Sequence, residues 1–406
     1  MSVALGLKRP MVVRTVPVGD PGDLIARLPD NAPFAWVRHG DGLVGWGEAA
    51  RVTVPHGPGR FAWARAWLTS IFRAADIHDP VGLPGSGPVA FGSFTFDPDS
   101  AGSTLVVPKT VLARRDGRAW LTTIGEDTLD LVTPVRTPGR IRYSDGALTT
   151  MEWEHAVATA VKEINSGRLD KVVLARDLIA TADRRIDPRA LLARLAARYP
   201  ECYTFSIGGP AGGLVGATPE LLVRHTGRAI ESLVLAGTSP SGADPAELFG
   251  SAKNRYEHAC AVASVRDALA TLCGTLDVPD DPELLVLPNV QHLASRVTGR
   301  LSDGASVLDV VAAMHPTAAV GGTPTATALE VIREREDMDR GGYAGPVGWI
   351  DARGDGEWGI ALRCAAITGD RARLFAGCGI MGGSDPAGEL AEAQAKLRVM
   401  RYALEG

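Results

Sequence analysis

Short apolar segments bounded by turn residues characterise the first third of the chain, and the clearest of them lie at 34–37, 89–96, 103–112 and 120–124. This length and these flanking residues are typical of β-strands and hairpins. A Gly/Pro-rich turn at 137–140 then precedes a change of pattern. We expect a mainly β N-terminal portion, residues 1–145, followed by a portion that mixes strands and helices, residues 146–406.

A helical period begins after Thr149. Thr149 and Glu152 have the spacing of a capping box, and apolar residues recur at helical intervals until Gly167 ends the helix. Start and stop signals predict further helices at 188–199, 253–272, 324–333 and 386–404. In the second of these, one face is expected to carry Tyr256, Cys260, Ala263 and Ala270.

Strands are predicted between these helices, at 171–179, 203–207, 214–217, 229–235, 343–350, 358–368 and 371–380. The last three are separated only by the tight turns 351–356 and 369–370. Strands joined in this way must be antiparallel, because a parallel pair needs a long crossover. The sequence therefore predicts an α+β protein rather than a dinucleotide-binding α/β sheet.

The amino-acid composition of the chain limits the classes of binding partner that we expect. The 406 residues are 45% hydrophobic and 22% charged, with a net charge of -5 and no basic stripe, so we expect a small-molecule partner, no nucleic acid and no membrane. The N-terminus lacks the apolar stretch of a signal peptide, and no apolar run approaches transmembrane length. The five cysteines are scattered, without the spacing of a zinc or redox pair. A cytoplasmic protein is expected.

Arg363 is the most informative single position. Strand alternation in WGIALRCAAI places it on one face with Gly359, Ala361 and Ala365. A guanidinium among such small residues has room for an anion beside it, and a buried charge must be paired. The alternative is an internal salt bridge to an Asp or Glu, which this pattern leaves equally open.

The last predicted helix carries Glu389, Glu392 and Lys396 on one face, at i, i+3 and i+4 spacings. Such a face is commonly solvated, with one helix salt bridge. The alternative is a carboxylate site for a hard cation. The preceding turn, 377–382, spells G-x-G-x-x-G, but the chain ends inside the helix, before the second strand that a dinucleotide fold requires.

The other candidate residues, taken one at a time, do not indicate a function. His292 is compatible with a buried structural histidine, Lys171 with a strand end, and Glu220, after Pro219, with the start of a helical turn. The signatures of P-loop nucleotidases, common zinc peptidases and α/β-hydrolases are absent from the sequence.

Taken together, these segments resemble a known family, the chorismate-utilising enzymes that include isochorismate, salicylate, anthranilate and aminodeoxychorismate synthases. The matching blocks, in the family's order, are KVVLAR (171–176), ATPELL (217–222), LAGT (235–238), KNRYEH (253–258), VQHL (290–293), HPTAAVGGTP (315–324), YAGPVG (343–348), IALRCA (360–365), AGCGIMGGSDP (376–386) and the E-x-x-E-x-x-x-K of Glu389, Glu392 and Lys396. The resemblance implies a single compact domain like anthranilate synthase component I, with large antiparallel sheets packed together and helices outside.

The resemblance also implies a site. Glu257 and Glu392 would bind Mg²⁺, with Glu389 as a possible outer ligand, and the metal would hold the ring carboxylate of chorismate. Lys171 would activate water and Glu220 would protonate the leaving hydroxyl. The implied substrate-binding residues are Gly237, Thr238, His292, Tyr343, Arg363, Gly377, Gly379 and Lys396.

Within the family, lysine at 171 favours water over ammonia as the nucleophile, so no glutaminase subunit is expected. Salicylate synthases share the lysine and the metal site but carry threonine where this chain has Ala319. Isochorismate formation is therefore the predicted reaction, with salicylate formation as the alternative. The product could serve menaquinone or siderophore biosynthesis, and the protein could be a monomer or a homodimer.

Overall fold

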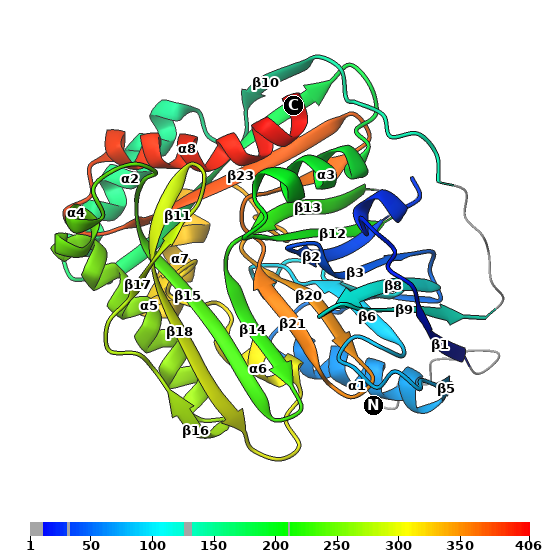
Figure 1. The fold of residues 1–406 in the computed structure, drawn as a ribbon. Helices are drawn as coiled ribbons and strands as arrows, with labels where there is room; N and C mark the ends of the chain where they lie inside the picture. The colour runs from blue at the N-terminus through cyan, green and yellow to red at the C-terminus, as the bar shows by residue number, and fades with distance from the viewer. Residues whose placement is uncertain (1–10, 31–32, 126–131, 210–211) are drawn as a thin grey trace.

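The computed structural model describes residues 11–30, 33–125, 132–209 and 212–406, which form two large β-sheets with helices around them (Figure 1). The N-terminal segment 1–10, for which the sequence predicts no signal peptide, lies outside the described residues. Among the described helices, none combines the length and the apolar character needed to cross a bilayer.

The first sheet has thirteen strands within the described residues. From edge to edge they are β10 (Ile141–Asp145), β11 (Lys171–Ala182), β23 (Arg371–Ile380), β22 (Cys364–Thr368), β13 (Gly212–Thr218), β12 (Tyr203–Gly209), β2 (Phe34–Arg38), β3 (Asp41–Trp46), β8 (Thr110–Arg115), β9 (Arg118–Ile124), β1 (Val12–Val18) and β5 (Asp76–His78), while β19 (Gly322–Thr323) pairs with β11. Among the strand pairs of this sheet that the structure describes, only the short β1–β5 pair is parallel.

The second sheet has ten described strands. Their order is β16 (Cys273–Asp277), β18 (Val290–Leu301), β15 (Ala229–Pro240), β14 (Leu221–Thr226), β21 (Gly356–Ile360), β20 (Pro346–Asp351), β6 (Val89–Ser93), β7 (Thr104–Val107) and β4 (Ala50–Thr53), while β17 (Glu283–Val286) pairs with β18. The predicted antiparallel pairing across the turns 351–356 and 369–370 is confirmed, in β20–β21 and β22–β23.

Aromatic side chains fill part of the space between the sheets. Phe34 of the first sheet stacks on Phe91 of the second, with 5.7 Å between ring centroids. Phe94 lies 5.5 Å from Trp358 in the same interior. Burying such large apolar rings removes them from water and is a major source of stability.

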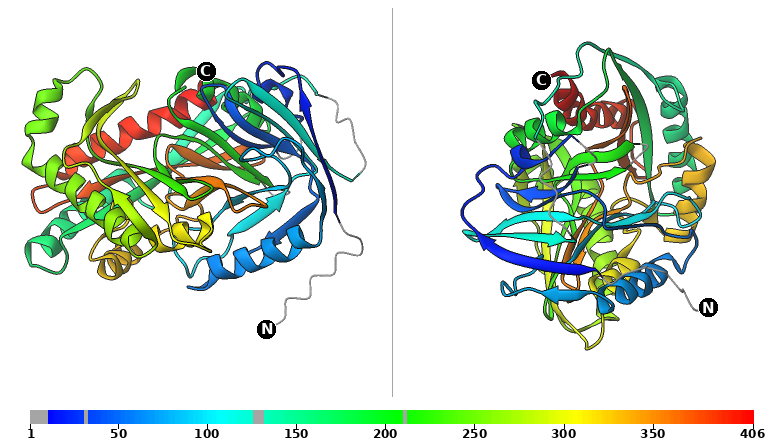
Figure 2. Two further views of the ribbon diagram at one scale, coloured as in Figure 1. Left: turned by 60° about the horizontal axis from the view of Figure 1, so that its bottom comes forward. Right: turned by 90° about the vertical axis from the view of Figure 1, so that its right-hand side faces the viewer.

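Helices cover the outer surfaces of the sheets (Figure 2). Their bounds are α1 (Arg60–Arg73), α2 (Thr150–Asn165), α3 (Pro188–Arg198), α4 (Pro245–Gly250), α5 (Ala252–Ala270), α6 (Val307–Met314), α7 (Thr325–Arg335) and α8 (Pro386–Glu405), with a short 3-10 turn at Ile25–Arg27. The predicted capping box of Thr149 and Glu152 begins α2, and Asp187 with Pro188 begins α3. The predicted face of α5 is wrong as a packing face: its buried residues are His258, Ala261, Val265 and Leu269.

The chain passes from one sheet to the other at two links that matter for the site. Between β13 and β14 the link contains Pro219 and Glu220, and between β21 and β22 it contains Ala361 to Arg363. The predicted strand 358–368 is therefore wrong as a single strand, because its two halves belong to different sheets. Glu220 begins no helical turn, since β14 follows it directly.

Both sheets contain strands from each side of residue 145. In the first sheet β2 pairs with β12, and in the second β6 pairs with β20. The N-terminal strands therefore continue the same sheets that carry the later strands.

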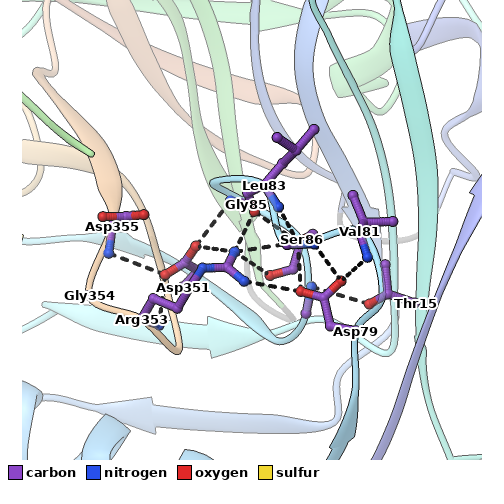
Figure 3. A network of polar contacts seen from close by, with 12 residues as sticks. Thr15, Asp79, Val81, Leu83, Gly85, Ser86, Asp351, Arg353, Gly354 and Asp355 are labelled. Carbon is purple, nitrogen blue, oxygen red and sulfur yellow. Dashed lines mark hydrogen bonds and ion pairs between the residues drawn. The ribbon is translucent and has the colours of Figure 1, made fainter. Parts of the chain in front are cut away.

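A network of buried polar groups joins the 79–86 loop to the turn between β20 and β21 (Figure 3). Arg353 donates to Asp351 at 2.8 Å and to Asp79 at 3.1 Å. Asp351 also accepts the backbone N–H of Gly85 at 3.1 Å, and Asp79 accepts the hydroxyl of Ser86 at 2.6 Å. One guanidinium thus serves two carboxylates that the fold keeps away from water.

Candidate active site

A pocket lies between the two sheets. Its walls come from β11 and β23 on one side and from β15 and β18 on the other, together with the two links between sheets. The structure brings these predicted residues to its lining: Glu220, Thr238, Glu257, His292, Tyr343, Arg363, Gly377, Gly379 and Lys396. Lys171, Gly237, Glu389 and Glu392 lie outside that lining, and we describe each through its contacts.

Lys171 begins β11 and is completely buried. Its Nζ lies 3.2 Å from Oε1 of Glu257, a residue of helix α5, which packs against β15 of the second sheet. This nitrogen has no hydrogen-bond partner among the described residues, so its contact with Glu257 is an ion pair alone. Gly379 makes this approach possible, because a Cβ there would overlap the Glu257 carboxylate and lie 3.2 Å from Cε of Lys171. The pair therefore depends on a glycine backbone.

Glu220 is buried at the link between β13 and β14. Burial raises the pKa of Glu220 to about 8, although Lys171 and Arg363 act in the opposite direction. The carboxyl therefore holds a proton at neutral pH, which is what a general acid requires.

Thr238 and His292 face each other across β15 and β18. Gly237 forms a bulge with a φ of +77°, so that Thr238 rather than Gly237 pairs with His292. His292 Nδ1 lies 3.1 Å from the Thr238 hydroxyl, and Nε2 lies 3.2 Å from a guanidinium nitrogen of Arg363. Without the bulge, the Thr238 side chain would no longer point toward His292.

Arg363 lies at the link from β21 to β22, with a left-handed φ of +49°. No carboxylate of the described residues lies within ion-pair distance of its guanidinium, so the salt-bridge alternative is wrong. Burial lowers the pKa of Arg363, yet an arginine stays cationic in proteins. A buried cation at a cavity wall without a carboxylate partner indicates a site for an anion.

The face of α8 with Glu389, Glu392 and Lys396 is not the solvated face of the alternative interpretation. Lys396 Nζ donates to the Gly377 carbonyl at 2.7 Å and lies 2.7 Å from Glu392. Burial would raise the pKa of Glu392, but Lys396 keeps it below its ordinary value. Glu389 is buried and lies 2.6 Å from Lys253 Nζ; burial and the neighbouring Glu392 raise the pKa of Glu389.

These carboxylates have the chemistry of a hard-cation site. Their oxygens are the ligands that Mg²⁺ prefers. Lys253, which begins α5, pairs with Glu389, and Glu257 and Glu392 lie close enough to raise the pKa of Lys253 further. A cationic group thus already lies among the three carboxylates. Cys378 also lies within reach of Glu389 and Glu392, but burial raises the pKa of its thiol well above the ordinary value, so it would not supply a thiolate.

Tyr343 faces the cavity beside Gly377. Its ring stacks on Phe375 with 5.0 Å between centroids, and a Cβ at Gly377 would lie 3.0 Å from its hydroxyl. Burial raises the pKa of Tyr343, so the phenol remains a hydrogen-bond donor.

Sequence reasoning missed Arg340, which also lines the cavity. It forms a buried ion pair with Glu336 and donates to the carbonyls of Val320 at 2.9 Å and Val173 at 2.8 Å. The i, i+4 spacing of Glu336 and Arg340 suggests a pair, but nothing local shows that it braces β11. Lys253 was missed too, because its partner Glu389 lies 136 residues away.

A sequence model of a protein family, described as chorismate binding enzyme, matches residues 132–405 of this chain. The chain belongs to the chorismate-binding enzymes. An enzyme of this family from Pseudomonas aeruginosa, named salicylate biosynthesis isochorismate synthase, is 36% identical over 400 residues, or 88% of this chain and 82% of that protein. The fold is similar to that of the menaquinone-specific isochorismate synthase of Escherichia coli, with a TM-score of 0.83, 27% identity and coverage of 98% and 95%.

The predicted fold class is confirmed by a further structure. Anthranilate synthase component I from Streptococcus pneumoniae superposes with a TM-score of 0.74 at 19% identity, covering 90% of this chain and 92% of that one. This likeness concerns the fold alone, and the resemblance to the family as a whole is confirmed by the family match.

Proposed function

We propose that this protein is an isochorismate synthase that converts chorismate to isochorismate. The observation that carries the proposal is the buried Glu220, which keeps its proton at neutral pH and faces the same cavity as Glu257, the ion-pair partner of Lys171. A protonated acid that lines the cavity, and a lysine that contacts the lining through Glu257, suit the addition of water and the departure of a hydroxyl group. The names of the similar proteins support the same reaction and favour it over salicylate formation.

In the proposed reaction a C–O bond forms at C2 as the C4–O bond breaks, and the ring double bonds shift between them. Lys171, after its ammonium has released a proton, takes a proton from the attacking water as the neutral amine, and Glu220 gives a proton to the leaving hydroxyl. Substrate and product are isomers, so no oxidant, reductant or amine donor takes part. We therefore expect no glutaminase subunit.

The substrate carries two carboxylates, and the cavity offers a separate binding group for each. Arg363 and Tyr343 would hold the enolpyruvyl carboxylate, with the backbone amides of Gly377 and Gly379. Lys396 adds positive charge beside them while it fixes the Gly377 carbonyl. Gly237 would place Thr238 beside the C4 oxygen, and His292 would lie near the ring carboxylate.

Glu257 and Glu392 would hold Mg²⁺, with Glu389 behind them. When bound, the ion would neutralise the ring carboxylate and make its approach to three glutamates favourable. The oxygen-only donor set, and the lysine cation that these carboxylates already attract, support this assignment. We further propose a cytoplasmic monomer or homodimer whose partner is chorismate, with no nucleic-acid or membrane partner.

The test is to incubate the purified protein with chorismate and Mg²⁺ and to separate the products by chromatography. We expect isochorismate to accumulate, and no turnover when Mg²⁺ is replaced by a chelator. Accumulation of salicylate and pyruvate would show the alternative reaction. Absence of any product would refute the enzymatic proposal.

A further inference from the structure

His292 is held between two different partners at the cavity wall. Its Nε2 lies 3.2 Å from the Arg363 guanidinium, and its Nδ1 lies 3.1 Å from the Thr238 hydroxyl. The three groups come from β18, from the link between β21 and β22, and from β15. The side chain is 5% exposed, so water does not compete strongly for either nitrogen.

The donors and acceptors of these groups permit only one arrangement. A guanidinium has N–H donors and no acceptor, so Nε2 must accept. Burial lowers the pKa of His292 well below its ordinary value, and the positive charges of Arg363 and Lys396 lower it further, so the ring is neutral. A neutral ring that accepts at Nε2 carries its proton on Nδ1. Nδ1–H therefore donates to the hydroxyl oxygen of Thr238.

This arrangement determines where the threonine proton goes. Because Nδ1 already carries a hydrogen, the Thr238 hydroxyl cannot donate to His292. Thr238 lines the cavity, so its own hydrogen is free to point toward a ligand there. The same ring accepts a hydrogen bond from Arg363. This bond fixes the orientation of the guanidinium and leaves its positive charge uncompensated.

We propose that His292 is a positioning residue, which acts on the substrate through Thr238 and Arg363 and makes the Thr238 hydroxyl a hydrogen-bond donor to the departing C4 oxygen. This inference rests on the proposed function and refines it. His292 would still lie near the ring carboxylate, but it would not hydrogen-bond to that group, because both of its nitrogens already have protein partners. Its contribution is to fix one proton and one cation at the wall of the cavity.

The tautomer can be observed directly in the full-length protein. We expect NMR of the ¹⁵N-labelled imidazole to show a protonated Nδ1 and an unprotonated Nε2 for His292, from pH 6 to pH 9 (a range of about three pH units around neutrality). His292→Asn identifies the signal. A proton on Nε2, or a doubly protonated ring in this range, would overturn the proposal whether or not the protein turns over chorismate.

Kinetics separate the two hydrogen bonds. His292→Gln keeps an acceptor that can reach Arg363 but loses the donor to Thr238, whereas His292→Asn keeps a donor at the Nδ1 position and loses the acceptor. We expect His292→Gln to lower kcat about 10-fold to 100-fold with little change in KM, and we expect the same of Thr238→Val. His292→Asn should instead raise KM for chorismate, because Arg363 is no longer directed.

The double variant His292→Gln with Thr238→Val decides whether the two residues act together. We expect it to be no slower than either single variant, because both remove the same hydrogen bond. Effects that multiply would overturn the proposal while leaving the enzyme assignment intact. If the wild-type protein neither binds nor converts chorismate, the proposed function fails instead. The NMR experiment then remains the test of the His292 tautomer.

Discussion

The backbone carbonyl of Glu220 accepts a hydrogen bond from the backbone N–H of Ile360, with 3.2 Å between nitrogen and oxygen. The hydroxyl of Thr218 adds a second connection, at 2.6 Å from the Ile360 carbonyl. These bonds join the two links through which the chain changes sheets, one carrying Glu220 and the other Arg363. The proposed acid and the anion-binding cation are thus held in register by main-chain hydrogen bonds as well as by packing.

The raised pKa of Glu220 predicts a pH dependence of turnover. Because the proposed general acid must be protonated, kcat should fall as the pH rises through about 8. Glu220→Gln cannot donate a proton and should lower kcat by at least about 100-fold. A pH profile of kcat for the wild-type protein checks this, and a kcat that stays constant to pH 10 (about two units above the pKa) would contradict the assignment.

The same carboxyl predicts a gain in stability when it is replaced. The unfolded chain releases this proton near the ordinary pKa of 4.5, whereas the folded protein keeps it up to about 8, so the free energy of unfolding falls between these pH values. Glu220→Gln should therefore raise the free energy of unfolding by about 4 kcal/mol at pH 8. Denaturant titrations measure it. Little of the gain should remain at pH 4.5, and an equal gain at both pH values would refute the explanation.

Gly379 permits the close approach of Glu257 to the first sheet. Gly379→Ala would place a methyl group over the Glu257 carboxylate, so we expect weaker Mg²⁺ binding and a kcat/KM about 10-fold to 100-fold lower, with little loss of stability. Calorimetric titration with Mg²⁺ checks the first effect. The matched control is Gly383→Ala, since a Cβ there meets nothing within 4 Å. Equal behaviour of the two variants would show that the contact is unimportant.

Lys253 competes electrostatically with a divalent cation. Its ammonium lies 2.6 Å from Glu389, so removing it should strengthen Mg²⁺ binding, by about 10-fold for Lys253→Met. The metal-free variant should melt at a lower temperature than the wild type, because Glu389 loses its partner. Mg²⁺ should remove this difference in melting temperature. Lys162→Met, on the exposed surface of α2, is the control. Unchanged or weaker metal binding in the Lys253 variant would contradict the competition.

The network of Figure 3 predicts a stability effect remote from the cavity. Arg353→Met leaves the fully buried side chain of Asp351 and the carboxylate of Asp79 without their shared cation, at a cost of about 2 kcal/mol. The exposed pair of Arg142 and Asp183 provides a control, since Arg142→Met should cost less than about 1 kcal/mol. Urea unfolding compares the two variants, and kcat should be unchanged in both.

Local patterns predicted the elements well where a period or a cap was present. Thr149 and Glu152 marked the start of α2, and the spacing of β22 and β23 required an antiparallel pair. Arg363 was predicted to face an anion from strand alternation, yet it lies where no strand continues. An unbroken apolar run does not reveal that the chain changes sheets within it. β14 was missed for a similar reason, because Pro219 and Glu220 resemble a helix start.

The relationships that sequence could not provide are those between distant segments. Lys171 comes from a strand of the first sheet and Glu257 from helix α5, and the partner of Lys253 comes from the last helix. Arg340 and Glu336 are close in sequence, but their burial against β11 depends on the whole fold. The family resemblance supplied the ligand set, whereas only the packed structure shows which cation faces which carboxylate.

The shared sheets have a consequence for any shortened version of the chain. Residues 132–405 contain every residue of the candidate site, yet β12 would lose β2 and β20 would lose β6 if the preceding strands were removed. Each loss would expose an unpaired strand edge with a buried apolar face, which is a template for aggregation. The segment that carries the side chains of the site is therefore expected to aggregate when it is produced without the preceding strands.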